Sequence, residues 1–347
     1  MGNNKTDTPV SIRREDLSAV LEGFGISKEI RRWHILTDWQ ERRGEAVALR
    51  IIVEVTLTGD ERKIVRFMNE RQFILDISRL VITTETIERQ CAFSDTLREN
   101  GLLVPQRYLY DGHYCMDYRL DGIPCDVTVE SWLENTQPRF RQDMFGPLGR
   151  LIGKIHHISE LEHCRIGFSI VYNEVEKGAM DFMRLFSGTD TSLLPAEDLH
   201  RLQHLHDEKK TFIAAIWPKL PKSSVQGDIY SCNNLAWQPD GTPGFYDFNI
   251  AADEVLLGDM LHAWFRTAYD VNYEAERQSW DLPCCWEQYL AGYTEIRPFT
   301  ILEKQALGEA YALLGAIYAA KYAAEQLRRG ETEQAVRAVS DALEYLE

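Results

Sequence analysis

The chain has 347 residues, of which 44% are hydrophobic and 27% are charged, the composition of an ordinary soluble globular protein with one large domain or two. Its net charge of −16 at pH 7 argues against nucleic-acid binding, because a phosphate backbone requires a basic protein surface. Such a charge suits a cationic small molecule as a partner, although solubility is the commoner reason for it.

Seven cysteines are scattered along the chain, and none of them forms a C-x-x-C pair. This pattern predicts reduced thiols in a cytoplasmic protein, with neither a disulfide framework nor a zinc site. The first residues are polar and do not resemble a signal peptide, although Gly2 and Thr6 fit a short acylation pattern that often arises by chance. No segment approaches about 18 consecutive apolar residues, so we expect no membrane span.

Residues 1–120 predict a small lobe of antiparallel strands with one inserted helix. A Gly-Asp turn at 58–62 lies between two segments rich in β-branched residues, which is the pattern of a β-hairpin. Apolar residues at helical spacing predict a helix over 85–100, with Gly101 placed to end it. Strands are predicted at 33–37, 46–57, 63–67, 107–110 and 113–120.

Residues 121–347 predict a larger, mainly helical lobe, so the fold class is α+β with two lobes. The stretch 121–140 begins with D-G-I-P turn chemistry and is interpreted as a connector. One short strand-like region is predicted around 234–247, with a turn at 239–241. Helices are predicted from 143 onward and over 196–217, 254–272, 284–293, 300–328 and 331–346.

The clearest chemical signal lies near residue 228, where the chain reads V-Q-G-D-I-Y-S-C-N-N and then, after an apolar segment, F-Y-D-F-N. Phosphoryl transfer requires a carboxylate that orients the attacking hydroxyl and takes its proton, and hard oxygen ligands that hold Mg²⁺ against the phosphates. Asp228 follows Gly227 in a predicted loop and suits the first task. Asn233 and Asp247 offer oxygen ligands for the second task.

The segment between the two candidate ligands predicts a short hairpin that brings them together. Its apolar residues are Leu235, Ala236, Trp237, Phe245 and Tyr246. Asp and Asn are also common in turns for backbone reasons alone, so neither the G-D nor the Y-D pair by itself indicates a function. The ordered set of three, behind a β-rich part and inside a helical part, favours a phosphoryl-transfer site.

This ordered set resembles the aminoglycoside phosphotransferase and choline kinase family, which has the protein-kinase fold and reads H-G-D-x-x-x-x-N and then D-[FW]-[GE]. The chain here reads Q-G-D-I-Y-S-C-N and Y-D-F-N. Weaker similarities to family motifs lie at 102–105, 151–156, 258–259 and 289–303. The resemblance covers roughly residues 20–345 and implies an N-terminal nucleotide-binding lobe at 1–120 and a C-terminal catalytic and substrate lobe at 121–347.

The resemblance implies an ATP-dependent kinase that uses Mg²⁺ and phosphorylates a hydroxyl of a small molecule, such as an aminoglycoside, choline or an amino alcohol. It makes Asp228 the catalytic base, and Asn233 and Asp247 the metal ligands. The family's phosphate-gripping cation lies near the end of the hairpin's second strand, where Arg66 stands. Lys63 is the competitor on the other face of that strand, and Arg66 is favoured because a guanidinium grips phosphate through a planar fork. An exposed strand cation is the alternative interpretation of Arg66.

The helix glutamate that pairs with this cation in the family is assigned to Glu88, although the spacing to Leu97 puts Gln90 nearer the expected place. Gln226 replaces the family's His before G-D, and we expect it to keep the loop by bonding backbone carbonyls. Asn249 replaces the Gly after D-F, and Asn tolerates a left-handed backbone better than most residues.

The loop between the first two strands contains Gly44 but no G-x-G-x-x-G, so phosphate contacts there would come from irregular backbone or from Arg42 or Arg43. This departure, together with Gln226 and Arg66, leaves open a kinase-like binding protein that does not catalyse. The identity of the acceptor, the choice between ATP and GTP, and the oligomeric state also stay open. Three carboxylates after the second Asp are interpreted as solvated charges or, less favoured, as an acidic rim for a cation: Asp253, Glu254 and Asp259.

Overall fold

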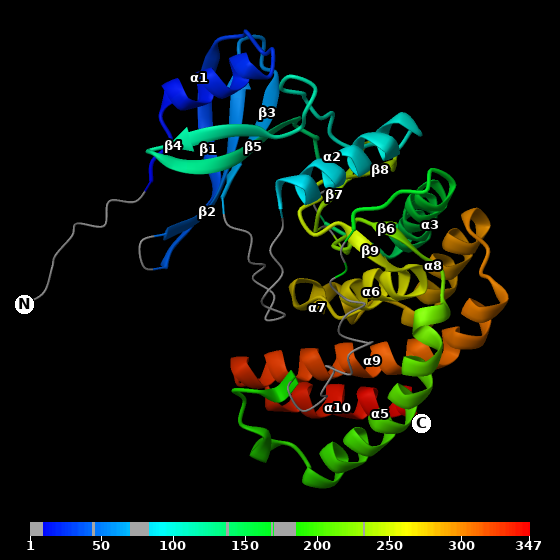
Figure 1. Ribbon diagram of the computed structural model, residues 1–347. Helices are drawn as coiled ribbons and strands as arrows, with labels where there is room; N and C mark the ends of the chain where they lie inside the picture. The colour runs from blue at the N-terminus through cyan, green and yellow to red at the C-terminus, as the bar shows by residue number, and fades with distance from the viewer. Residues whose placement is uncertain are drawn as a thin grey trace, which may run out of the picture. The chain divides into compact units, whose positions relative to one another are not determined.

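The computed structural model of the protein describes residues 10–43, 46–69, 83–136, 139–167, 169, 185–231 and 233–347. Outside the described residues lie several to which the sequence predictions refer: Gly2, Thr6, Gly44 and Cys232, and the side chains of Arg42 and Arg43. The chain divides into two compact units, Met1–Glu134 and Asn135–Glu347 (Figure 1). Within the described ranges, no helix is both long enough and apolar enough to cross a membrane.

The division between the units follows Glu134, whereas the sequence prediction placed it between residues 120 and 121. That position falls in the turn between β4 (Met116–Leu120) and β5 (Ile123–Ser131), which pair with each other. The prediction of a connector beginning at residue 121 is therefore wrong for β5. The β-branched V-T-V of β5 pairs with the preceding sheet and belongs to the first unit.

The first unit is built on an antiparallel sheet, as the sequence predicts, and its strand order is β1-β2-β3-β5-β4. Its other elements are α1 (Arg14–Gly23), β1 (Ile30–Arg43), β2 (Ala46–Leu57), β3 (Arg62–Met68) and α2 (Thr84–Glu99). The β2–β3 hairpin turns at Gly59 and Asp60, which both have positive φ, so its Gly-Asp pair has the predicted role. The predicted strand at 107–110 is instead a stretch with isolated bridges.

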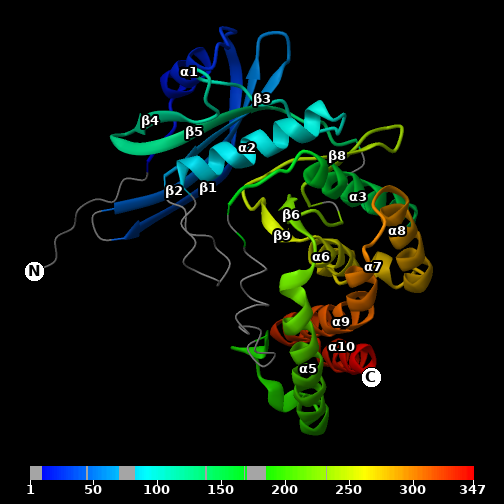
Figure 2. The same ribbon diagram turned by 45° about the vertical axis from the view of Figure 1, so that its right-hand side comes forward.

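Alternation along β3 places Lys63 and Arg66 on opposite faces of the sheet, as predicted. Val65 and Phe67 share the face of Lys63 and pack in a hydrophobic core with Leu17 and other apolar residues of α1. Arg66 lies on the other face, on the side of α2 (Figure 2), where its charge acts on the thiol of Cys91. The first unit thus encloses its core on one side and leaves a charged side chain beneath α2 on the other.

The second unit is mainly helical, as predicted (Figure 1). Its α-helices are α3 (Phe145–Leu161), α5 (Ala196–Ile216), α6 (Leu256–Ala268), α7 (Glu274–Arg277), α8 (Leu282–Ile296), α9 (Ile301–Arg329) and α10 (Thr332–Leu346). Short 3-10 turns lie at Gln142–Met144, Thr191–Leu193, Trp217–Lys219 and Val271–Tyr273. Gly330 ends α9 with a φ of 80°, the left-handed cap that its position predicts.

Two small strand pairs interrupt the helices: β6 (Lys222–Val225) with β9 (Ala252–Val255), and β7 (Leu235–Trp237) with β8 (Pro243–Phe245). The β7–β8 hairpin is the predicted one. The β6–β9 pair was not predicted. The helix predicted at 254–272 is α6, which begins at Leu256, because its first two predicted residues belong to β9. Polar residues pair across it: Ser224 lies opposite Asp253 and donates to its carboxylate at 2.7 Å. A strand buried through such bonds lacks the apolar alternation that sequence reading detects.

Glycines let α3 and α8 approach closely. A Cβ atom on Gly149 of α3 would lie 2.0 Å from the carbonyl oxygen of Tyr289, and one on Gly292 of α8 would lie 2.3 Å from that of Gly146. Larger residues at these positions would separate the helices. The contact therefore fixes α3 beside α8, and both helices contribute to the polar network described below.

Candidate active site

The loop between β6 and β7 turns at Gly227, whose φ is 81°. Just before it, the buried side chain of Gln226 accepts a hydrogen bond from the backbone N–H of Asp228 at 2.7 Å. The same side chain donates to the carbonyls of Tyr246 and Asp247, at 3.0 and 2.7 Å. The prediction that Gln226 keeps this loop through backbone hydrogen bonds is confirmed, and it joins the loop to the end of the hairpin.

The carboxylate of Asp228 is held on two sides. Its Oδ2 accepts from the side-chain amides of Asn233 and Asn234, at 3.0 and 2.9 Å. Its Oδ1 lies 2.5 Å from Nη1 of Arg266, near the end of α6. About a quarter of the Asp228 side chain (24%) stays exposed, so the carboxylate is oriented but still accessible. Such a group can receive a hydroxyl proton.

Asn234 and Arg266 were not recognised in the sequence. The N-N pair at 233–234 was the available signal for Asn234, which is 8% exposed and has a φ of 56° that Asn tolerates. Arg266 had no such signal, because it belongs to a helix distant in sequence. Lys and Arg are also common in the last turn of helices in general, so its position did not indicate a function. The Arg266 guanidinium also lies 4.0 Å from the ring centre of Tyr230.

The hairpin brings Asp247 back to the loop. β7 and β8 pair in register, and the N–H of Tyr246 donates to the carbonyl of Asn234 at 3.0 Å. Asn233 therefore precedes one strand and Asp247 follows the other, at the open end of the hairpin. Asp247 has a φ of 60°, a conformation that non-glycine residues rarely adopt and that is found often at functional sites. The sequence suggested a left-handed backbone at Asn249, but in this segment it is Asp247 that has the positive φ.

Two oxygen donors, from Asn233 and Asp247, lie at this end of the hairpin. The amide nitrogen of Asn233 donates to the carbonyl and the carboxylate of Asp228, which directs its amide oxygen away from them. The amide oxygen of Asn233 and the carboxylate of Asp247 are hard oxygen ligands of the kind that Mg²⁺ prefers. In the described part of the chain, this end of the hairpin included, no group of three or more His, Cys, Asp and Glu side chains is arranged to hold a metal.

The cations predicted in the first unit are buried and paired. Arg66 contacts Oε1 of Glu130 at 2.6 Å, and Arg107 contacts Oε2 of the same carboxylate at 2.5 Å. Arg66 is 5% exposed, so the interpretation as an exposed strand cation is wrong. Glu88, assigned as its partner, instead accepts the backbone N–H groups of Tyr114 and Cys115.

On the opposite face, Lys63 is also buried, and it donates to Glu61 and to the hydroxyl of Tyr108. Gln90, the position nearest the expected glutamate, is buried in α2. Burial is the largest influence on the neighbouring thiol of Cys91 and raises its pKa. The charges of Arg66, Arg107, Glu130 and Glu88 also act on this thiol, which places all four groups in one cluster.

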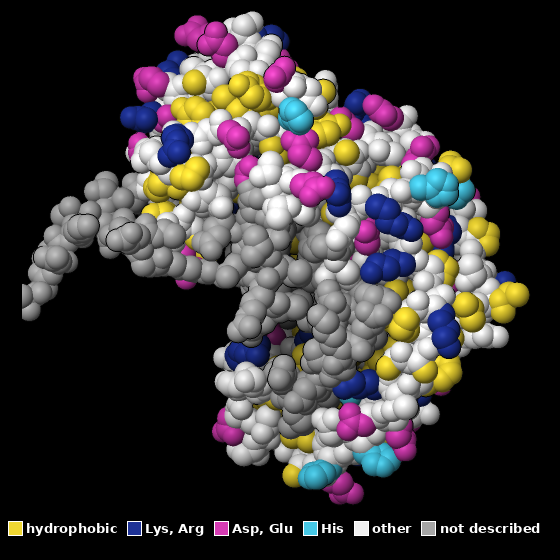
Figure 3. All heavy atoms as spheres, viewed as in Figure 1, with side chains coloured by type: hydrophobic (Ala, Val, Ile, Leu, Met, Phe, Trp, Pro, Cys, Tyr) yellow, Lys and Arg dark blue, Asp and Glu magenta, His cyan; other side chains and the backbone are white. Residues whose placement is uncertain are grey.

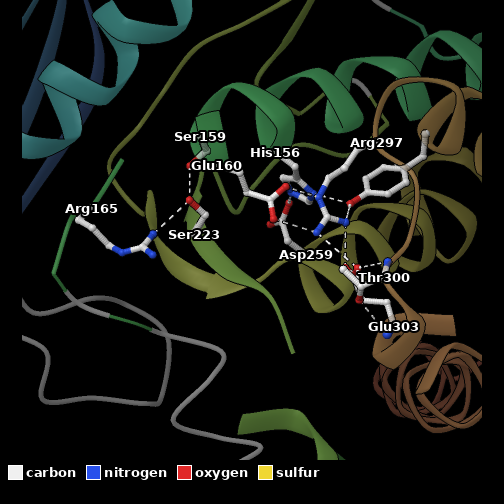
Figure 4. Close-up of polar contacts among 10 residues, drawn as sticks. His156, Ser159, Glu160, Arg165, Ser223, Asp259, Arg297, Thr300 and Glu303 are labelled. Carbon is white, nitrogen blue, oxygen red and sulfur yellow. Dashed lines mark hydrogen bonds and ion pairs between the residues drawn. The ribbon is translucent and has the colours of Figure 1, made fainter. Parts of the chain in front are cut away.

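Three of the segments that weakly resemble family motifs contribute residues to a buried polar network of the second unit (Figure 4). His156 bonds to Asp259 at 3.0 Å through one ring nitrogen and to the Tyr293 hydroxyl at 2.9 Å through the other. Arg297 donates to the same hydroxyl at 2.9 Å and lies between the carboxylates of Glu160 and Glu303. The segments 151–156, 258–259 and 289–303 thus form one internal scaffold.

The three carboxylates proposed as a rim or as solvated charges are neither. Asp253 accepts the N–H groups of Ile166 and Gly167, both at 2.9 Å, and Glu254 accepts the hydroxyl of Ser169 at 3.0 Å. Both are buried, and Asp259 binds His156. On the described atoms of the face in Figure 3, acidic and basic side chains are interspersed.

Comparison with known proteins supports the fold. A microcompartment-associated aminopropanol kinase aligns at a TM-score of 0.57 with 17% identity, over 88% of this chain and 90% of that one. The amicoumacin kinase hAmiN, solved with AMP-PNP, Ca²⁺ and Ami, aligns at 0.57 with 12% identity, over 95% and 94%. An aminoglycoside phosphotransferase from Alicyclobacillus acidocaldarius aligns at 0.57 with 11% identity, over 99% and 96%.

The sequence matches no protein-family model and no curated protein. The structural similarity extends over nearly the whole chain, and the chain has the protein-kinase-like fold of these phosphotransferases. This fold is the one that the catalytic-loop resemblance implies.

Proposed function

We propose that this protein is an ATP-dependent small-molecule kinase that transfers the γ-phosphate to a hydroxyl of its acceptor. The observation that supports this most directly is the convergence of the loop and the hairpin. Asp228 bonds to Asn233 and is joined to Asp247 through Gln226. A fold shared with small-molecule kinases makes phosphoryl transfer the natural use of this arrangement.

In the proposed reaction, the acceptor oxygen bonds to the γ-phosphorus, the bond from that phosphorus to the β–γ bridging oxygen breaks, and ADP leaves. Asp228 orients the acceptor hydroxyl and takes its proton. Asn233 and Asp247 would hold Mg²⁺, which supplies charge neutralisation at the phosphates when bound. Arg66 is the proposed phosphate-binding cation, and its pairing with Glu130 would hold its guanidinium in place.

The experiment is a measurement of ADP release with ATP, Mg²⁺ and a panel of hydroxylated acceptors. Turnover is expected for the native protein and is expected to vanish in Asp228→Ala and Asp247→Ala. Asp240→Ala is the matched control, because Asp240 lies in the turn of the same hairpin and bonds only locally to the N–H of Thr242. Undiminished turnover in both site variants would refute the proposal. Thermal stabilisation by ATP and Mg²⁺ without turnover of any acceptor would favour the kinase-like binding protein.

A further inference from the structure

The approach of a hydroxyl to Asp228 is restricted by the partners of its two carboxylate oxygens. Oδ2 already accepts two amide N–H groups, whereas Oδ1 has one contact, to Arg266. A carboxylate oxygen has two lone-pair directions, so Oδ1 keeps one of them for a further donor. A hydroxyl that uses it lies beside the Arg266 guanidinium.

The position of Arg266 is fixed by aromatic and polar neighbours. Its guanidinium stacks on Tyr230, with 4.0 Å between the guanidinium carbon and the ring centre. Burial alone would lower the pKa of Arg266, but Tyr318, Asp228 and Tyr230 raise it above the ordinary value, so the group stays cationic. It is still 31% exposed, which leaves the guanidinium accessible to a ligand.

A second cation lies beyond this group. His262 is one helical turn before Arg266 on α6, so the two lie on one face of the helix, and His262 bonds to the Tyr318 hydroxyl at 2.7 Å. The ammonium of Lys321 lies 5.0 Å from the ring centre of Tyr318. The charges of Lys321 and Arg266 both act on His262, so two cations lie near this part of α6, and Arg266 is the one that contacts Asp228.

The three carboxylates of the segment 253–259 are engaged inside the protein. Asp253 and Glu254 bind the segment 166–169, and Asp259 binds His156. Asp270, whose charge also acts on Tyr230, caps the short turn after α6 by accepting from Asn272 at 3.0 Å. The proposed reaction uses two other carboxylates, Asp228 for the acceptor hydroxyl and Asp247 for the metal.

We infer that the acceptor carries an anionic group beside its reactive hydroxyl, as in a hydroxy acid or a sugar acid, and that Arg266 selects it. The inference rests on the proposed function and identifies the acceptor class of the same site. An acceptor carboxylate next to the hydroxyl pairs with the guanidinium through a planar fork, whereas an ammonium there is repelled. It therefore revises the cationic acceptor that the net charge and the family resemblance suggested.

The test uses one sugar scaffold with three charges: glucuronate, glucose and glucosamine, each offered with ATP and Mg²⁺ to the full-length protein. We expect kcat/KM for ADP release to be highest for the acid and lowest for the amine, by about 10- to 100-fold, because a unit charge a few ångströms away acts with that strength near a protein surface. Glycolate, ethylene glycol and ethanolamine repeat the comparison on a smaller scaffold.

Substitutions of Arg266 test whether this residue selects the charge of the acceptor or only holds Asp228 in position. Arg266→Gln is expected to raise the KM for the acid about 10- to 100-fold and the KM for the neutral acceptor less than about threefold, while kcat falls alike for both because Asp228 loses a partner. Arg266→Lys keeps a cation and is expected to restore part of the preference. Arg329→Gln, an exposed cation of α9 paired with Glu325, is the control and should leave the preference unchanged.

Preference for the amine, or an acid preference that survives Arg266→Gln, overturns this inference while ATP turnover leaves the proposed function standing. If none of these acceptors is phosphorylated, calorimetric binding of the same three sugars in the presence of ADP and Mg²⁺ tests the charge selection alone. Binding of glucosamine at least as tight as that of glucuronate would then overturn the inference.

Discussion

The loop around Asp228 and the polar network of the second unit are built from the same residue types but differ in burial. In the network, Arg297, His156 and Glu303 are buried and meet charged or polar partners inside the protein. In the loop, Asp228 and Arg266 are 24% and 31% exposed. Both sets come from segments that resemble one family. Burial separates the residues that hold the fold from those that are available for chemistry.

The loop also differs from the network in backbone conformation. Ser231, Asn234 and Asp247 have positive φ values although none of them is glycine. Each such residue costs of the order of 1–3 kcal/mol, and the surrounding contacts must compensate for it. The Gln226 hydrogen bonds and the apolar hairpin provide such contacts, so the strained segment depends on a rigid surrounding scaffold.

The largest expected effect is on activity. Asp228→Asn is expected to lower ADP release by about 10²- to 10⁴-fold, the usual contribution of a positioned base, and to change the melting temperature little because the residue is partly exposed. The measurements are steady-state ADP release and thermal unfolding followed by circular dichroism. A large loss of stability would show that Asp228 belongs with the network rather than with the chemistry.

The next largest effect is expected in the polar network, where a substitution should lower the free energy of unfolding and leave activity in place. Arg297→Met leaves Glu303, which is fully buried, and the half-exposed Glu160 without their shared cation. Breaking a buried pair from one side typically costs about 3–5 kcal/mol of unfolding free energy. Urea unfolding measures it, with Arg329→Met as the exposed control, where a change within about 0.5 kcal/mol is expected. Activity per folded molecule is expected to survive, and its loss would contradict the division between the regions.

A smaller effect tests the helix contact beneath the network. Gly149→Ala introduces a methyl group against the Tyr289 carbonyl and is expected to destabilise the protein by about 1–3 kcal/mol. Gly308→Ala on α9 is the control, because no atom lies within 4 Å of the added Cβ there, and it is expected to stabilise by up to about 1 kcal/mol. Equal effects at the two positions would show that α3 and α8 do not approach so closely.

The smallest expected effect is a pH dependence of the free energy of unfolding, and it comes from His262, one helical turn before Arg266 on α6. Burial, and then the charges of Lys321 and Arg266, lower the pKa of His262 to about 3. Below about pH 6.5 the unfolded chain therefore binds a proton at His262, whereas the folded protein does not. The free energy of unfolding falls as pH decreases from there. Between pH 7 and pH 5 we expect a loss of about 1–2 kcal/mol that His262→Gln removes, measured by urea unfolding at both values. An identical pH dependence in the variant would refute this.

Much of the fold was predictable because its signals are local. The β2–β3 hairpin, α2, α5 and the helices α9 and α10 follow from turn residues and periodicity within each segment. Loop residues Gln226 and Asp228 and the hairpin to Asp247 are close enough in sequence for spacing to indicate that they converge. The short strands β6 and β9 escaped detection, because Ser224 and Asp253 are buried there through a hydrogen bond to each other.

By itself, the sequence determined the two-lobed class of the chain, the order of most elements and the three-residue set at the hairpin, all of which depend on neighbours along the chain. Tertiary structure alone decided that Arg266 contacts Asp228, that Glu130 is shared by Arg66 and Arg107, and that Asp253 and Glu254 are internal. The physical reason is that an ion pair depends on distance and burial in space. Residues from separate helices and strands acquire both only when their elements pack together.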